Sequence, residues 1–292
     1  MFDKFRFAAG SAPMKRPVAD EATPRLPPKK AKPAVLVRKW QERYHGICDA
    51  CFEAVTECTH HADVALRLLV VGHNPSDNAW QSGFSYSNPS NRMWKLLMGD
   101  FHGQRWRGVL PPDWSMSDQN AMPHELGIGF SDLGHEPGND AAAYGKATMQ
   151  RWTREFYDRM RAHIQRVKAT LHTGDCNSVY AHGPMLVAFM GKRQYTFLFD
   201  PPLKKVETGR QDPSSLPPDW PLPPSCEVWV LPSSSGRAAM TDKARCTPYR
   251  DLAARFHAIP WPSPPNSSCC AAISSENDGI KSEDDDSRIK TE

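Results

Sequence analysis

The sequence predicts an α/β protein: a three-layer α/β/α sandwich with a mostly parallel central sheet. Short apolar runs typical of buried strands, such as residues 68–71 and 227–231, alternate along the chain with segments of helical period, such as residues 148–170. Polar turns follow the strand-like runs directly. Because the carboxyl ends of parallel strands meet at one edge of a sheet, we expect these turns to form one site.

Composition indicates where the chain is folded. The sequence has 292 residues and 27 prolines, and many of these prolines lie near the two ends. A single core of about 190 residues remains, enough to bury roughly 70% of its unfolded surface. We predict a disordered basic, proline-rich arm at 1–35, a helical Cys/His-rich segment at 36–65, a folded domain at 66–259 and a disordered acidic tail at 260–292.

Several classes of protein are disfavoured. No apolar run reaches the roughly 18 residues of a membrane span, so no membrane contact is expected. The first ten residues lack the apolar stretch of a secretory signal; a mitochondrial presequence stays open, although Asp3 and the following prolines count against it. Eight irregularly spaced cysteines then favour reduced thiols.

Cysteines and histidines gather ahead of the first strand-like run. Residues 37–44 have a helical pattern and lead into this group. Three thiols and one imidazole suffice for a tetrahedral zinc site, so the spacing predicts structural zinc; the alternative is ordinary buried thiols. The predicted ligands are Cys48, Cys51, Cys58 and His60.

The stretch from residue 67 to residue 95 carries most of the chemistry. The strand-like run continues directly into the turn Gly72-His73-Asn74-Pro75-Ser76. Gly72 lets the backbone approach a substrate closely, and Pro75 fixes the turn so that the Asn74 amide has a defined position.

Later strand-like runs end in similar turns. The run at 126–130 is followed by Ser131 and Asp132, and residues 186–192 have the pattern of a strand, a glycine turn and a helix start that presents Lys192 to a phosphate. A serine-rich turn, residues 232–237, follows the last run, and residues 249–256 close the core as a helix.

In order, these motifs resemble those of the mismatch-specific uracil and thymine DNA glycosylases. The resemblance covers residues 66–256. It rests on Gly72-His73-Asn74-Pro75, Tyr86 with Asn91-x-x-Trp94-Lys95, Gly127-Ile128-Gly129-Phe130-Ser131, Gly191-Lys192 and Pro232-Ser233-Ser234-Ser235-Gly236-Arg237.

The resemblance implies a monofunctional glycosylase that flips uracil, or thymine, mispaired with guanine out of double-stranded DNA and hydrolyses its N-glycosidic bond, which initiates base excision repair. Asn74 matches the catalytic asparagine, whose amide oxygen orients the attacking water. Asparagine cannot take a proton, so we expect a slow enzyme that relies on electrostatic stabilisation and uses no cofactor for catalysis.

Other positions are assigned by the same resemblance. Tyr86 matches the aromatic residue that stacks on the flipped base. The other expected pocket residues are Gly72, His73, Pro75, Ser76, Asn91 and Ser131. The expected DNA contacts are Lys192, Ser233, Ser234, Ser235, Gly236 and Arg237, with Arg237 entering the hole left by the flipped nucleotide.

The chain departs from the family pattern at His73 and Ser76, where the family commonly has Ile and Gly. Ser76 narrows the pocket if glycine is needed there for its backbone conformation. His73 is either a polar pocket group or a hydrogen-bonded histidine facing the sheet. Taken singly, Asn74 could form a turn, Tyr86 could be a core aromatic residue, and residues 233–235 could cap a helix.

Two further motifs lie in the terminal segments. Lys15-Arg16 and Lys29-Lys30-Ala31-Lys32 resemble a bipartite nuclear localisation signal, or a basic arm that holds DNA phosphates, so we predict a nuclear protein. Lys281 and Lys290 stand in hydrophobic-Lys-x-Glu patterns that resemble SUMO acceptor sites, which makes the SUMO machinery an expected partner; chance occurrence in an acidic tail is the alternative.

Two other functions remain open from sequence alone. One is a catalytically weak or inactive DNA-binding protein of the same fold that acts as a regulator. The other is an adaptor built around the Cys/His segment.

Overall fold

The computed structural model describes residues 38–171, 182–236 and 238–261, and all that follows concerns these residues. They belong to one compact unit, residues 36–292. The basic clusters of the arm, Arg237, and the acidic tail with Lys281 and Lys290 lie outside the described residues.

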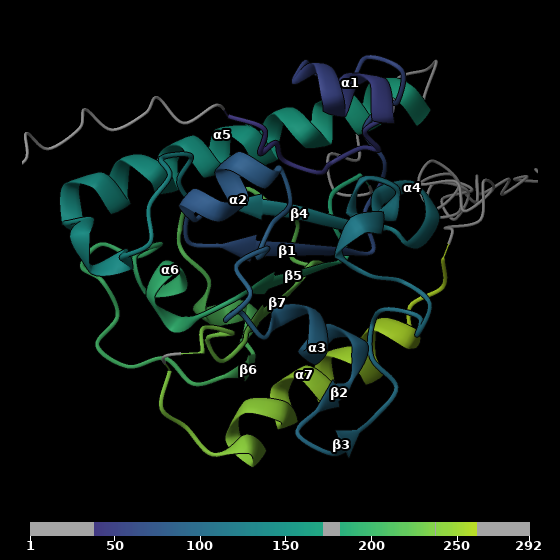
Figure 1. Ribbon diagram of the computed structural model, residues 1–292. Coiled ribbons are helices and arrows are strands. Elements are labelled where there is room, and N and C mark those ends of the chain that lie inside the picture. The colour runs from purple at the N-terminus through teal and green to yellow at the C-terminus, as the bar shows by residue number, and fades with distance from the viewer. Residues whose placement is uncertain (1–37, 172–181, 237, 262–292) are drawn as a thin grey trace, which may run out of the picture. The chain divides into compact units, whose positions relative to one another are not determined.

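A five-stranded sheet with the strand order β4-β1-β5-β7-β6 forms the middle layer (Figure 1). β1 (Leu68–Gly72), β4 (Ile128–Asp132), β5 (Leu186–Phe189) and β7 (Glu227–Val230) run parallel. β6 (Gly209–Arg210), from the proline-rich insertion, pairs antiparallel with β7 at one edge. The predicted mostly parallel sheet is confirmed.

Helices cover both faces of this sheet. Leu69 and Val71 of β1 pack in the apolar cluster of α5 (Lys146–Leu171), whereas Leu68 and Val70 pack in the cluster of α3 (Met93–Met98) and α7 (Asp242–His257). Successive strand residues point to opposite faces, so one apolar run supplies two cores. The three-layer α/β/α arrangement is confirmed. No helix among the described residues has the length and apolar character needed to cross a membrane.

Short elements connect these layers. The expected loop at 99–122 contains a small hairpin and a 3₁₀ turn. The short helices are α1 (Asp49–Ala54), α2 (Asp77–Ser82), α4 (Met122–Leu126) and α6 (Lys192–Thr196); the hairpin is β2 (Asp100–Phe101) with β3 (Gln104–Arg105); the 3₁₀ turns are η1 (Met116–Asn120), η2 (Ala141–Ala143) and η3 (Pro213–Ser215).

The predicted helix at 37–44 is wrong, because residues 38–45 contain no helix. Arg43 instead forms an antiparallel bridge to Phe130: its N–H donates to the Phe130 carbonyl at 2.8 Å, and the Phe130 N–H donates back at 3.1 Å. β4 is an edge strand whose backbone groups need partners, and this segment supplies them. The Cys/His-rich segment therefore belongs to the same compact unit as the sheet.

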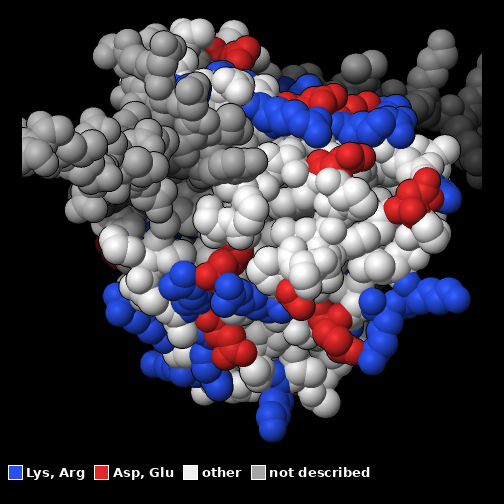
Figure 2. Space-filling model, turned by 180° about the vertical axis from the view of Figure 1, so that it is seen from behind, with Lys and Arg blue, Asp and Glu red and all other residues white. Residues whose placement is uncertain are grey.

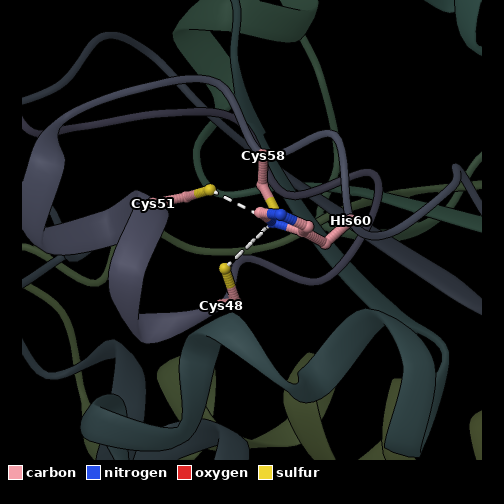
Figure 3. Close-up of side chains that lie close together, drawn as sticks. All are labelled: Cys48, Cys51, Cys58 and His60. Carbon is pink, nitrogen blue, oxygen red and sulfur yellow. Dashed lines mark hydrogen bonds between the residues drawn. The ribbon is translucent and has the colours of Figure 1, made fainter.

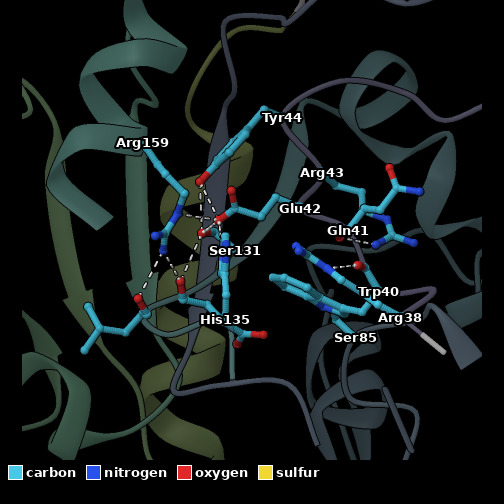
Figure 4. Close-up of polar contacts among 12 residues, drawn as sticks. Arg38, Trp40, Gln41, Glu42, Arg43, Tyr44, Ser85, Ser131, His135 and Arg159 are labelled. Carbon is cyan, nitrogen blue, oxygen red and sulfur yellow. Dashed lines mark hydrogen bonds and ion pairs between the residues drawn. The ribbon is translucent and has the colours of Figure 1, made fainter. Parts of the chain in front are cut away.

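A partly buried ion pair joins the same segment to α5 (Figure 4). Arg159 donates from Nε to Glu42 Oε1 at 3.0 Å and from Nη2 to the Asp132 carbonyl at 2.7 Å. Burial alone would raise the pKa of Glu42, but the charge of Arg159 and hydrogen bonds from His135 and Ser131 outweigh it and lower the pKa to about 2. Glu42 is therefore ionised at neutral pH.

Candidate functional site

A cavity of about 460 Å³ opens at the carboxyl edge of the sheet. It is lined by the turns that follow β1, β5 and β7 and by the last residue of β4. Motifs far apart in the sequence meet there, as the parallel strand order predicts. The predicted site residues that line it are Gly72, His73, Asn74, Pro75, Ser76, Tyr86, Asn91, Lys192, Ser233, Ser234 and Ser235.

The absence of a side chain at Gly72 determines the shape of the cavity floor. The strand register places Gly72 beside Asp132. A Cβ atom at position 72 would collide with Asp132 Oδ1 and lie 2.8 Å from the Tyr86 hydroxyl. Only glycine leaves room for both polar groups at the end of β1.

Asp132 is a cavity residue that the sequence reasoning did not assign to the site. Its carboxyl group lies on the cavity floor beside Gly72. Burial, reinforced by the negative charge of Glu42, raises the pKa of Asp132 to about 8, although the positive charge of Arg159 opposes the shift. The group is therefore mainly a neutral carboxylic acid at pH 7, which can donate one hydrogen bond and accept another.

Ser131, predicted to line the pocket, does not line the cavity. Its hydroxyl bonds to Tyr44 OH at 2.9 Å and to Glu42 in the buried network beside α5 (Figure 4). Because strand side chains alternate between faces, the residue after Ser131 is the one that reaches the cavity. This alternation was the available signal for Asp132.

The Asn74 amide is held in one orientation. Its nitrogen donates to the carbonyl oxygens of Glu136 at 2.9 Å and Gly138 at 3.2 Å, which fixes the other amide atom as the oxygen. That oxygen lies 2.7 Å from His73 Nδ1. Burial chiefly lowers the pKa of His73, so the imidazole is neutral at pH 7 and donates from Nδ1. An amide oxygen has two lone pairs, so one remains for a water.

His73 thus has a role that neither sequence interpretation fully described. Its ring lies among aromatic side chains, 5.9 Å from Tyr144 and 5.5 Å from Trp152 between ring centroids, yet it also lines the cavity. The His73 side chain therefore positions Asn74 by a hydrogen bond while its ring packs against these aromatic side chains.

Tyr86 occupies an unusual backbone conformation at the cavity wall. Its φ angle is 58°, in the left-handed region that non-glycine residues rarely adopt. The ring packs against the core cluster of α3 and α7, and the buried hydroxyl has no hydrogen-bond partner among the described residues. Burial, with the charge of Asp132 as a further cause, raises the pKa of Tyr86 well above its usual range.

Ser76 and Asn91 begin helices at the cavity wall. The Ser76 hydroxyl accepts from the Ala79 N–H at 3.1 Å as the N-cap of α2, and the Asn91 amide oxygen accepts from the Met93 N–H at 2.9 Å at the start of α3. Ser76 has φ −69°, so its backbone does not require glycine. Its side chain therefore caps a helix, and such a cap stabilises by about 1 kcal/mol.

The serine loop is held by α7. Arg245, a fully buried residue, donates to the Ser233 carbonyl at 2.7 Å, and Tyr249 OH donates to the Pro232 carbonyl at 2.9 Å. The helix itself is capped by Thr241, so the serines do not act as its N-cap. Sequence reasoning missed Arg245 and Tyr249, since nothing in their local pattern links them to the loop.

Gly236 continues this loop and passes close to the loop between α2 and α3. A Cβ atom at position 236 would lie 2.7 Å from the Ser90 carbonyl oxygen. The backbone of Arg92 also donates to the Ser234 carbonyl at 2.9 Å. The serine loop and the start of α3 are therefore joined through their backbones.

Among the described residues, the lysine and arginine side chains that line the cavity are those of Lys192 and Arg193. Lys192 lies exposed at the first position of α6 and lines the cavity. On α5, Arg151 pairs with Glu155 and Arg161 pairs with Asp158, which partly neutralises its predicted basic face. On the side shown in Figure 2, basic and acidic side chains lie near one another around a wide uncharged area.

The Cys/His cluster can hold a metal ion. The ligand atoms of Cys48, Cys51, Cys58 and His60 all lie within 4.8 Å of one another (Figure 3). Cys48 caps α1, Cys51 lies within that helix, and the other two residues come from the loop that follows. The cluster is separate from the cavity, because none of its residues lines it.

No protein-family model matches the chain. The fold and the site define an α/β protein with a polar cavity at the carboxyl edge of a mostly parallel sheet, and a separate Cys/His cluster whose ligand atoms are close enough together to hold a metal ion.

Replacing Gly72 with alanine tests the cavity floor. We expect Gly72→Ala to lower the free energy of unfolding by about 1 to 3 kcal/mol, because Asp132 and Tyr86 must leave buried positions. Chemical denaturation measures the change. Gly145→Ala is the matched control, since a methyl group there meets no atom within 4 Å. Equal stability of the two variants would contradict the close packing of Asp132 and Tyr86 against Gly72.

Proposed function

We propose that the protein is a DNA glycosylase that removes uracil, and thymine where its methyl group fits, from mispairs with guanine. The observation that supports this proposal most strongly is the convergence of Asn74, Tyr86 and the serine loop on one cavity. These residues come from separate motifs, and the proposed reaction requires them together: a water-positioning group, an aromatic surface for the base and a loop that enters the duplex.

The chemistry follows from the arrangement of these groups. The flipped base stacks on Tyr86, and such stacking contributes about 1 to 3 kcal/mol per base. The Asn74 oxygen orients a water toward the anomeric carbon of the deoxyribose, while the hydrogen bond with His73 restrains the amide. Hydrolysis proceeds through a cationic sugar and a departing pyrimidine anion. Because Asn74 cannot abstract a proton, catalysis depends on electrostatic stabilisation of these two charged groups.

The serine loop and Lys192 suit contact with DNA around the flipped nucleotide. The serine hydroxyl groups and the Lys192 ammonium group can contact phosphates. Arg237 belongs to the same sequence motif as the serines. A mispaired base costs less to unstack than a correctly paired one. Uracil opposite guanine is therefore the preferred substrate over uracil opposite adenine.

The first prediction concerns the reaction itself. In single-turnover assays on labelled duplexes, we expect uracil opposite guanine to be cleaved faster than uracil opposite adenine. Asn74→Ala should slow cleavage by about 100-fold or more, because the water loses its orienting oxygen. Asn78→Ala, an exposed asparagine on α2 outside the cavity, should cleave at the wild-type rate. Duplex binding without abasic product would favour the catalytically inactive DNA-binding protein instead.

Asp132 supplies a partner for the edge of the base. As a neutral acid it can donate from its hydroxyl to uracil O4 and accept from uracil N3–H. Ionisation removes the donor and places a negative charge beside the departing anion. Its position beside Gly72 and Tyr86 on the cavity floor supports this role.

A pH profile tests the role of Asp132. Because the neutral form is active and its pKa is raised to about 8, the cleavage rate should be constant below this value and fall above it, by about tenfold per pH unit. Asp132→Asn retains a donor and an acceptor but does not titrate, so its rate should not fall in this range. The same fall in both proteins would eliminate Asp132 as the titrating group.

We further propose that the Cys/His cluster holds structural zinc. Zinc–sulfur and zinc–nitrogen bonds of about 2.3 and 2.0 Å in a tetrahedron imply sulfur–sulfur and sulfur–nitrogen separations of about 3.8 and 3.5 Å. Cys58 and Cys48 sulfurs are 3.9 Å apart, and His60 Nδ1 lies 3.4 Å from the sulfurs of Cys48 and Cys51. These three distances fit the zinc geometry, whereas the distance from the Cys58 sulfur to His60 Nδ1 is longer, at 3.9 Å.

Metal analysis tests this proposal. Atomic emission on the purified full chain should give one zinc per molecule, and Cys51→Ser should lose it. The control Cys246→Ser changes a buried thiol on α7, far from the cluster in sequence, and should retain the metal. If the wild-type protein, expressed in zinc-supplemented medium and then purified, contains no zinc, the proposal is refuted.

A further inference from the structure

The residues that precede Tyr86 are in contact with the Cys/His segment. The rings of Phe52 and Phe84 lie 5.0 Å apart between centroids. Gly83 lies so close to the Phe52 ring that a Cβ atom at position 83 would come within 2.6 Å of it. Phe52 follows the predicted ligand Cys51 directly on α1, so the contact begins one residue from the metal cluster.

A second set of contacts reaches the same loop from residues 40–43. Arg43 Nη2 donates to the Gly83 carbonyl at 2.6 Å, and its guanidinium lies 5.9 Å from the centre of the Phe52 ring. Trp40 Nε1 donates to Ser85 Oγ at 3.1 Å (Figure 4). These side chains are fully buried, so the positions of the loop backbone and of Phe52 are coupled through them.

A third contact passes through the 3₁₀ turn η1. The Ile47 N–H donates to the Asn120 carbonyl at 3.1 Å, next to the cysteine cluster in sequence. The neighbouring Gln119 accepts from the Ser85 N–H at 2.9 Å through its side-chain oxygen. All three sets of contacts end within residues 83–85, immediately before Tyr86.

The residues around the metal cluster, from Ile47 to Cys58, form only a small apolar cluster. This apolar cluster consists of Ile47, Cys51 and Cys58, with Cys48 and Phe52 packed against it. Three of these side chains are the predicted thiol ligands. α1 has only six residues, too few for a helix that is stable alone. Metal coordination is therefore the interaction suited to hold Phe52 in position.

We propose that a metal ion bound by Cys48, Cys51, Cys58 and His60 braces the loop at 83–85 and so holds Tyr86 at the cavity wall. Tyr86 needs support because its left-handed backbone conformation is strained for a residue with a side chain. Phe52 is the positioning residue, since it contacts the loop without binding metal or lining the cavity. The effect on the base rests on the proposed glycosylase function; the effect on the loop does not.

Hydrogen exchange of the full chain tests whether the metal holds the loop at 83–85, and this measurement does not depend on catalytic activity. Removing zinc with a chelator should speed exchange of the amides of Gly83 and Ser85 by more than about tenfold, while the β1 amides stay protected. Adding zinc back should restore the slow exchange. Unchanged exchange at Gly83 and Ser85 after measured loss of zinc would overturn the proposal.

Phe52→Ala separates the brace from general loss of the metal. It should keep one zinc per chain, speed exchange at Gly83 and Ser85, and raise the enzyme concentration for half-maximal single-turnover cleavage about tenfold with less change in the maximal rate. Phe199→Ala, which removes a ring that contacts Tyr195 instead, is the control. Slow exchange at both amides in Phe52→Ala would also overturn the proposal.

The two proposals fail in different ways. If the wild-type protein releases no base from any duplex, the glycosylase function is wrong, while zinc-dependent exchange at Gly83 and Ser85 still supports the brace. If the protein excises uracil and the exchange rates of these amides do not change when zinc is removed, the metal does not support the loop and the glycosylase function stands.

Discussion

The close approach of Gly72 to Asp132 is the constraint on which the site depends. Parallel pairing of β1 with β4 sets these residues side by side, and the missing side chain of Gly72 leaves space for a carboxyl group and a tyrosine hydroxyl. Burial at this point keeps Asp132 mainly neutral at pH 7. The backbone then turns into His73 and Asn74, so one glycine affects both the floor of the cavity and the start of its polar turn.

Two parts of the cavity wall are contacted by residues that do not line the cavity. Arg245 and Tyr249 fasten the serine loop from α7, and Phe52 and Arg43 contact the loop before Tyr86. Such contacts reduce the freedom of the groups in the cavity before any ligand binds, which suits a reaction that depends on positioning more than on proton transfer. In our proposal, a metal ion at the Cys/His cluster extends this support to the loop before Tyr86.

The segment at 38–45 shows why local pattern can mislead. Trp40 and Tyr44 lie four residues apart, a spacing compatible with a helix. The free edge of β4 instead offers backbone partners, and Glu42 pairs with Arg159 on α5. Those tertiary interactions outweigh a weak local preference. Ser131 was expected in the pocket and Asp132 was given no role for a related reason, since resemblance to a motif does not say which of two neighbouring strand residues faces the cavity.

The sequence by itself determined the α/β class, the buried strands, the long helix α5 and the turns that meet at one edge, because apolar periodicity and glycine or proline turns are local properties. It also identified the thiol and imidazole groups of the cluster. Only the tertiary structure decided that Asp132 faces the cavity, that His73 orients Asn74, and that Arg245 and Phe52 hold loops distant in sequence. These depend on strand register and on contacts between separate segments, which one-dimensional spacing does not specify.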